Sequence, residues 1–175
     1  KMPPSYDSTD TEQLTQAEID GRRRMMEVLS YYQEMEKKPW MLDHCSPIIG
    51  IREGARIAGL YVLNIEDLMA GREFDDAIAS SEWSLDHALY KGQKEVPPYQ
   101  IPLRCLIARD VKNLMMAGRC FSSDWYALSS ARVSTTSSMM GQAAGIGAAL
   151  AVKNGCNAHD LDAEQVRHTV EERGA

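Results

Sequence analysis

Residues 113–123 read Asn-Leu-Met-Met-Ala-Gly-Arg-Cys-Phe-Ser-Ser, and residues 134–147 read Ser-Thr-Thr-Ser-Ser-Met-Met-Gly-Gln-Ala-Ala-Gly-Ile-Gly. The first stretch is typical of a strand that opens into a polar loop, which is a usual place for a ligand site in α/β sheets. The second stretch predicts a helix, because hydroxyl residues suited to capping precede a run rich in Gly and Ala that ends at Asn154-Gly155. We therefore expect a strand, a loop and a helix over residues 108–154.

The start of this expected helix carries no bulky side chain that would block its backbone. Free N–H groups and a partial positive charge of about half a unit at a helix N-terminus suit an anion or a polarised carbonyl. Packing alone also explains the pattern, since small residues let a helix approach a sheet closely while serines and threonines cap it. Both interpretations stay open at this point. The small residues concerned are Gly141, Ala144, Gly145 and Ala148.

A long helix is expected earlier in the chain, over residues 16–39, after a loop over residues 1–15. Thr15 and Glu18 have the spacing of a capping box, and Pro39 should end the helix. Apolar residues repeat along this helix at intervals of three and four, which predicts one buried stripe. The stripe consists of Met25, Val28, Leu29, Tyr32 and Met35.

Residues 41–107 contain short apolar runs broken by proline and glycine, which predict strands. The best candidates are residues 48–51 and 60–63, and we expect these two to pair as a hairpin. Residues 99–107 form a further apolar run. The mixed and polar residues 72–97 are expected at the surface.

Helix signals are clearest near Asn64 and Asp162. Asn64 is expected to cap a short helix, and a turn of helix is expected over residues 75–79. Asp162 is expected to cap the last helix, which lies within residues 155–175. Gly174 follows that helix at a position typical of a C-terminal stop.

Composition and charge argue against several classes of protein. The chain has 175 residues, with 19 Lys and Arg against 25 Asp and Glu, and this net charge of −6 does not favour a nucleic-acid partner. The longest run of small apolar residues, 143–152, is shorter than the ~20 residues that span a membrane, and the start shows no signal-peptide core. Four cysteines without a C-x-x-C pair predict reduced thiols in a cytoplasmic protein, and the scattered histidines predict no metal site.

Residues 113–151 resemble the closing strand, loop and helix of FAD-dependent oxidoreductases of the two-domain type, in the neighbourhood of fumarate reductase flavoproteins. The resemblance extends upstream in three shorter blocks, residues 47–59, 67–72 and 74–79. It implies an α/β fold class, reduced to α+β here, as the C-terminal portion of a two-domain FAD-binding fold. Residues 41–107 are then part of a substrate-domain sheet, and residues 108–154 belong to the FAD domain.

The same resemblance implies FAD as the cofactor and assigns the residues that contact it. Those implied to line the flavin are Gly118 and Arg119 near the ribityl-pyrophosphate region, Val133 and Ser134 beside the isoalloxazine ring, and Ser138, Gly141 and Gln142 by the ring or the ribityl chain. Arg132 is implied to be catalytic, next to the flavin or a substrate carboxylate. Arg52 lies in a turn that the resemblance places at the active-site mouth, where it either anchors a substrate carboxylate or forms an ordinary surface ion pair.

Two departures from the family pattern bear on function. Trp125-Tyr126 stands where members of the family often have a His-Glu pair, so the proton-transfer partner is open. The fingerprint G-x-G-x-x-G is absent, and the nearest approach, Gly145-Ile-Gly147, lies inside a helix pattern instead of opening one. The chain therefore lacks the dinucleotide-binding βαβ unit that would cradle the ADP half of FAD.

We expect a C-terminal fragment or subunit of an FAD-dependent oxidoreductase that contributes the pyrimidine and ribityl side of the flavin site for hydride transfer and is inactive alone. Its expected partners are the missing N-terminal half, in the same or a separate chain, a small-molecule substrate and a second copy in a homo-oligomer. One alternative is a non-catalytic fragment that binds a partner through its long helix and holds no flavin. Another is a complete small domain that binds a different anionic ligand at residues 134–138.

Overall fold

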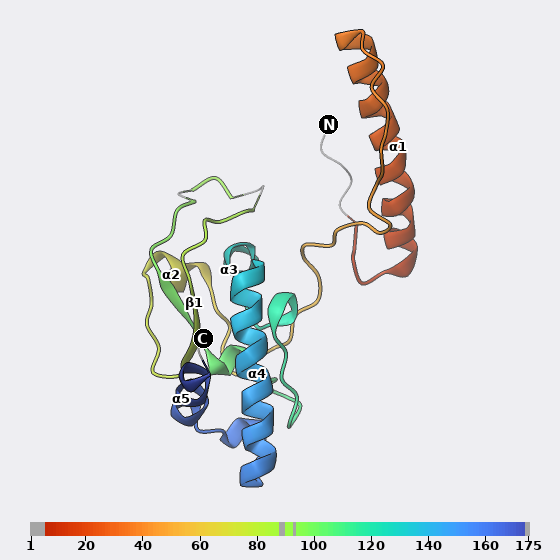
Figure 1. The fold of residues 1–175 in the computed structure, drawn as a ribbon. Helices are drawn as coiled ribbons and strands as arrows, with labels where there is room; N and C mark the ends of the chain where they lie inside the picture. The colour runs from red at the N-terminus through yellow and green to blue at the C-terminus, as the bar shows by residue number, and fades with distance from the viewer. Residues whose placement is uncertain (1–5, 88–89, 93, 174–175) are drawn as a thin grey trace. The chain divides into compact units, whose positions relative to one another are not determined.

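The computed structural model describes residues 6–87, 90–92 and 94–173, and the chain divides into two units, Lys1–Ala55 and Arg56–Ala175. Figure 1 shows the helices and strands of both units along the chain. Each unit is described by itself below.

A single long helix, α1 (Thr11–Glu36), dominates the first unit. The Asp10 side chain caps it by accepting hydrogen bonds from the backbone N–H groups of Glu12 and Gln13. The helix therefore begins before Thr15, and the expected loop over residues 1–15 is wrong beyond Asp10. The helix ends at a left-handed Lys37, ahead of Pro39.

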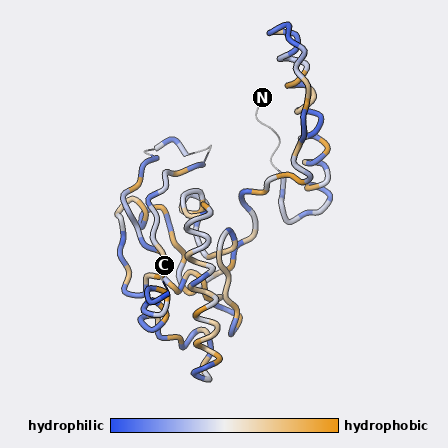
Figure 2. Tube along the Cα trace, in the orientation of Figure 1, coloured by the Kyte–Doolittle hydropathy of each residue, from blue (hydrophilic) through white to orange (hydrophobic). Residues whose placement is uncertain are grey.

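The apolar stripe of α1 is not buried, contrary to the prediction from its spacing. Ala17 is the only residue of α1 that is buried, whereas the side chains of Val28, Tyr32 and Met35 are 54%, 49% and 64% exposed. Figure 2 shows hydrophobic and hydrophilic residues mixed along this helix. Periodicity correctly predicts the helix, but it does not show what covers the apolar side.

The expected hairpin between residues 48–51 and 60–63 does not form. Residues 48–51 belong to the first unit and have no strand structure. In the second unit, the Leu60 N–H donates to the Ile107 carbonyl over 3.0 Å, and the Leu63 N–H donates to the Ser122 carbonyl over 3.2 Å. Residues 60–63 therefore pair with segments far along the chain.

The second unit is built on a small antiparallel sheet of β1 (Ala77–Ser81) and β2 (Tyr99–Pro102). The helices α4 (Ser134–Asn154) and α5 (Ala163–Glu172) pack against β1 and against each other. The described residues are thus α+β, which confirms the expectation for this portion of the fold. The helical turn predicted over residues 75–79 is wrong, because the buried alanines and isoleucine of this segment form β1.

The described part of the second unit also contains two short helices, α2 (Ile65–Met69) and α3 (Trp125–Ala131), and three 3-10 turns, Leu103–Cys105, Gly118–Cys120 and Ala158–Asp160. The predicted caps are confirmed at Asn64, which forms a reciprocal capping box with Asp67, and at Asp162, which begins α5. α4 ends, as expected, at a left-handed Gly155. Gly174, the expected stop after α5, lies outside the described residues.

The Cys105 thiol lies in the core and is fully buried, and burial raises its pKa from 9.0 to about 12. A raised pKa means that folding favours the neutral thiol. The contribution of Cys105 to stability is therefore complete below pH ~9 and is lost as the pH rises toward ~12.

We expect the four thiols to react with a disulfide reagent at different rates near neutral pH. In variants that retain one cysteine each, the exposed Cys45 and Cys120 should react quickly, and Cys105 should react only when urea unfolds the chain. Rapid labelling of Cys105 in the folded chain, at a rate similar to that of Cys120, would show that this core is open.

Candidate functional site

The segment that leads into the site is a short antiparallel pairing instead of a full strand. The Ala108 N–H donates to the Leu114 carbonyl over 2.9 Å, and the Met116 N–H donates to the Leu106 carbonyl over 2.8 Å. Only one residue pair, Ile107 with Met115, has bridge geometry. The strand expected over residues 113–117 is thus reduced to this bridge. The chain continues from the bridge directly to Gly118.

Gly118 starts a 3-10 turn, Gly118–Cys120, with a φ of +69°, a backbone conformation that favours glycine. A Cβ atom placed on Gly118 would lie 3.9 Å from the Cβ of Ser137. The turn therefore lies beside the first turns of α4, and Gly118 and the helix start form one local surface. This contact brings together two of the segments assigned to the flavin.

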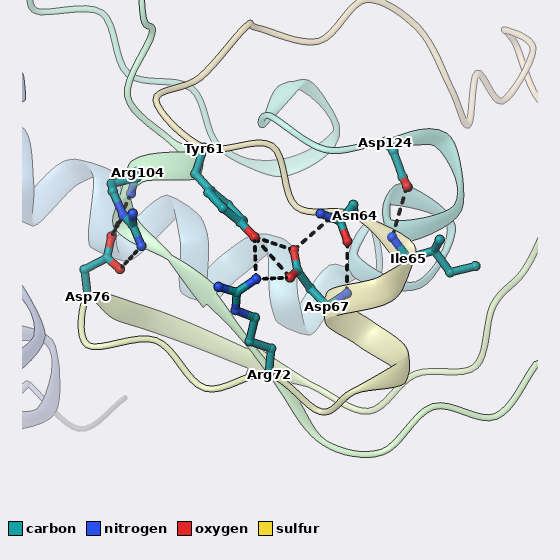
Figure 3. Close-up of polar contacts among 8 residues, drawn as sticks. All are labelled: Tyr61, Asn64, Ile65, Asp67, Arg72, Asp76, Arg104 and Asp124. Carbon is teal, nitrogen blue, oxygen red and sulfur yellow. Dashed lines mark hydrogen bonds and ion pairs between the residues drawn. The ribbon is translucent and has the colours of Figure 1, made fainter.

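Asp124 positions the helices that precede α4. One of its carboxylate oxygens accepts from the Ala127 N–H over 2.6 Å and begins α3, while the other accepts from the Ile65 N–H over 3.0 Å at the start of α2 (Figure 3). A single carboxylate therefore fixes two helix starts, although Asp124 and Ile65 are 59 residues apart in sequence. The sequence interpretation assigned this stretch to a loop and missed α3, although Asp124 is a typical N-cap residue.

Asp67 forms a second buried polar centre, with an exposed fraction of 3%. Its carboxylate accepts from the Tyr61 hydroxyl over 2.8 and 3.0 Å, from Arg72 Nη1 over 2.8 Å and from the Asn64 N–H over 3.2 Å (Figure 3). Burial and the neighbouring Asp67 carboxylate raise the pKa of Tyr61, so this phenol stays neutral and remains a donor. These bonds join Tyr61 and Arg72, on either side of α2, to the same carboxylate.

The first turn of α4 has no side-chain cap. Val133 occupies the N-cap position and offers no side-chain acceptor, so the serines and threonines predicted as caps lie inside the helix. A hollow of about 350 Å³ adjoins this end of the helix. It is lined by Ser80, Ser81, Glu82, Trp83, Pro98, Val133, Thr135 and Thr136.

The glycines of α4 divide into two groups by their surroundings. A Cβ atom placed on Gly141 or Gly145 would meet nothing within 4 Å, whereas one on Gly147 would lie 3.3 Å from both Leu161 Cδ1 and Met115 Cε. Internal packing therefore explains Gly147 but not Gly141 or Gly145. Ser134 and Ser138 are exposed like Gly141, and Gln142 is half-buried.

Arg132 follows α3 directly and serves as its C-cap residue. Its side chain is 8% exposed, and Nη2 donates to the Asp86 carbonyl over 2.9 Å and lies 3.6 Å from an Asp86 carboxylate oxygen. The guanidinium is thus held by the segment around Asp86, next to the start of α4. A catalytic role for Arg132 stays a prediction, and the structure shows what would position it.

The other two arginines assigned to the site differ in their environment. Arg119 is exposed in the Gly118 turn and has no hydrogen-bond or ion-pair partner among the described residues. Arg52 is exposed and belongs to the first unit, Lys1–Ala55, whereas the other assigned residues lie in the second unit. Its grouping with them stays a prediction.

Trp125 and Tyr126, which stand in place of the family's His-Glu pair, form the first turn of α3. The ring of His87 packs edge-on against both, with centroid distances of 6.3 Å to Trp125 and 5.1 Å to Tyr126. A histidine from a distant segment therefore lies at these two positions. No sequence spacing could have indicated this contact.

The described residues show neither a metal-binding cluster nor a membrane-spanning helix. Within residues 6–87, 90–92 and 94–173, no cluster of three His, Cys, Asp or Glu side chains has the arrangement to hold a metal ion. Over the same part of the chain, no helix combines the length and the apolar character needed to cross a membrane.

Comparison with known proteins identifies the family. A family model described as FAD dependent oxidoreductase matches residues 2–170, which is nearly the whole chain. The chain therefore belongs to the FAD-dependent oxidoreductase family, and FAD is the cofactor of that family, as the resemblance implied. No curated protein and no solved structure matches the chain.

Replacing Asp67 is expected to destabilise the second unit. Asp67→Asn removes the charge that Arg72 and Tyr61 share and should lower the free energy of unfolding by about 1.5–3 kcal/mol, the range for hydrogen bonds to charged groups. Urea unfolding monitored by circular dichroism measures the change. Asp110→Asn is the matched control, since Asp110 pairs with Arg109 at the exposed surface and should give no measurable loss. Equal effects of the two variants would contradict a special role for Asp67.

The two glycine groups of α4 predict opposite responses to alanine. Gly141→Ala should raise the free energy of unfolding by about 1 kcal/mol, because an exposed helical glycine gains helix propensity without a clash. In Gly147→Ala, crowding of the new methyl group against Leu161 and Met115 should cancel the gain in helix propensity. Thermal midpoints of the two variants test the difference, and a Gly147→Ala variant as stable as Gly141→Ala would count against it.

Proposed function

We propose that this chain contributes the pyrimidine and ribityl side of the flavin site in an FAD-dependent oxidoreductase. The observation that carries the proposal is the open surface at Gly141 and Gly145, on a helix whose start is uncapped and lies beside the Gly118 turn. Two exposed glycines cost helix stability without improving internal packing. A ligand that approaches the backbone closely would explain why both positions are glycine.

The residues at the start of α4 fit a flavin by their chemistry. Gly118 and Ser138 present a backbone and a hydroxyl group without bulk, and at the start of α4 the positive end of the helix dipole is formed by the N–H groups of Val133 and Ser134. These N–H groups stabilise negative charge on a bound carbonyl edge. When bound, FAD supplies the two-electron chemistry of the family.

Two arginines extend this site in different ways. Arg119 has an exposed guanidinium in the Gly118 turn with no partner among the described residues, and it suits the phosphate-proximal part of the cofactor. Arg132 is held by Asp86, so it would place a fixed positive charge beside the first turn of α4. Gln142, half-buried on α4, completes the proposed site in the second unit. Arg52 of the first unit stays a separate prediction as the anchor of a small-molecule substrate.

The ADP half of FAD requires residues from elsewhere. These 175 residues contain no G-x-G-x-x-G fingerprint, and the sheet among the described residues is antiparallel and two-stranded. We propose that a further segment or a separate chain supplies the dinucleotide-binding unit, and that the chain alone is inactive. The exposed stripe of α1 favours the alternative function, a partner-binding or self-associating fragment without flavin.

Bulky substitutions on the open side of α4 test the placement of the flavin in the flavin-loaded protein. Gly141→Leu and Ser138→Trp should weaken flavin binding at least about tenfold, because they fill space that the proposal gives to the cofactor. The flavin-to-protein ratio should therefore fall. Thermal stability of the flavin-free protein should stay unchanged or rise for Gly141→Leu. Absorbance near 450 nm, about where oxidised flavin absorbs, reports occupancy.

Ala149→Leu provides the matched control for these variants. Ala149 is exposed on the same helix, about two turns further along, and its enlargement should leave the flavin content unchanged. Full flavin occupancy in Gly141→Leu and Ser138→Trp would place the cofactor elsewhere. Loss of flavin in all three variants would point to a general defect of α4 and would also contradict the proposal.

A further inference from the structure

Three arginines of the second unit stack on aromatic rings, and two of them have carboxylate partners. Arg72 lies over Tyr61 and Phe74 and pairs with Asp67, and Arg104 lies over Tyr61 and pairs with Asp76 through two bonds of 2.8 and 3.0 Å. This combination of an aromatic support and an oxyanion is the usual way to satisfy a guanidinium.

Arg56 has the aromatic support, but among the described residues it has no carboxylate partner. Its guanidinium carbon lies 5.4 Å from the centre of the Trp125 ring. Its Nη1 atom is buried and has no hydrogen-bond partner in the described part of the chain. A buried donor without an acceptor costs free energy and calls for an explanation, and a bound anion provides one. The residue lacks the partner that Arg72 and Arg104 both have.

The surroundings of Arg56 indicate what kind of anion fits. Trp125 is 57% exposed, so much of its ring faces solvent beside a positive charge. His87 packs edge-on against Trp125 and Tyr126, and Tyr90 packs against Tyr126 with a centroid distance of 5.1 Å. An aromatic cluster of this kind attracts an apolar or planar organic group, which inorganic phosphate does not offer.

We propose that Arg56 and Trp125 form a binding site for a small organic carboxylate. The carboxylate pairs with the Arg56 guanidinium, whose plane is held by Trp125, and the apolar body of the ligand lies against the exposed Trp125 ring and the neighbouring Tyr126. The site consists of residues that were not assigned to the flavin. It therefore goes beyond the proposed function and does not require FAD to be bound.

Titration calorimetry of the 175-residue chain with sodium benzoate tests this site. Benzoate should bind saturably, and Arg56→Gln should weaken the binding by about tenfold or more, as expected for loss of a charge-assisted pair. Benzyl alcohol, which has the ring without the charge, and inorganic phosphate, which has the charge without the ring, should each bind more weakly. In a Trp40→Phe, Trp83→Phe background, benzoate should also change the fluorescence of the remaining Trp125.

Two further variants separate the effect of Arg56 on binding from general effects of charge and folding. Arg109→Gln removes an exposed arginine that pairs with Asp110 and should leave benzoate binding unchanged. If Arg56→Gln lowers the thermal midpoint, Arg56→Lys retains the charge without the two-pronged geometry and should still bind more weakly than the parent. Absent benzoate binding, equal affinity in the Arg56 variants, or phosphate and benzyl alcohol binding as tightly as benzoate would each overturn the proposal. None of these outcomes depends on flavin content.

Discussion

The arrangement of the second unit depends on the two oxygens of the Asp124 carboxylate. One oxygen begins α3 at Ala127, and the other holds the start of α2 at Ile65. Because α3 is only two turns long, its start also determines where Arg132 and Val133 emerge and hence where α4 begins. The position of the proposed flavin surface is therefore set by a capping interaction that lies outside it.

The surroundings of α4 differ along its two sides. Gly147 allows close packing against Met115 and Leu161, whereas Gly141 and Gly145 leave the helix open to the exterior. Packing therefore explains Gly147, whereas a ligand-binding role for Gly141 and Gly145 stays a proposal. Membership in the FAD-dependent oxidoreductase family gives the open side a chemical context that geometry alone does not provide.

Features encoded by adjacent residues could be predicted from the sequence, and features that depend on distant contacts could not. The caps at Asn64 and Asp162 and the stop at Gly155 follow from local hydrogen bonds and backbone preferences. The strand β1 was missed because its alanines and serines have no strong strand preference and acquire it only by pairing with β2. Near the proposed site, α4 was correctly predicted to be a helix. The contact of His87 with Trp125 and the unpartnered Nη1 of Arg56 among the described residues arise from tertiary structure.

The exposed apolar side of α1 also affects how the chain responds to heat. The heat capacity change on unfolding comes mainly from newly exposed apolar surface and is about 12–15 cal/mol/K per residue in ordinary domains. Residues 11–36 add length to the chain but bury only Ala17, so they contribute little to that change. The stability curve of the whole chain is consequently flatter per residue than that of a uniformly packed protein, with weaker cold destabilisation.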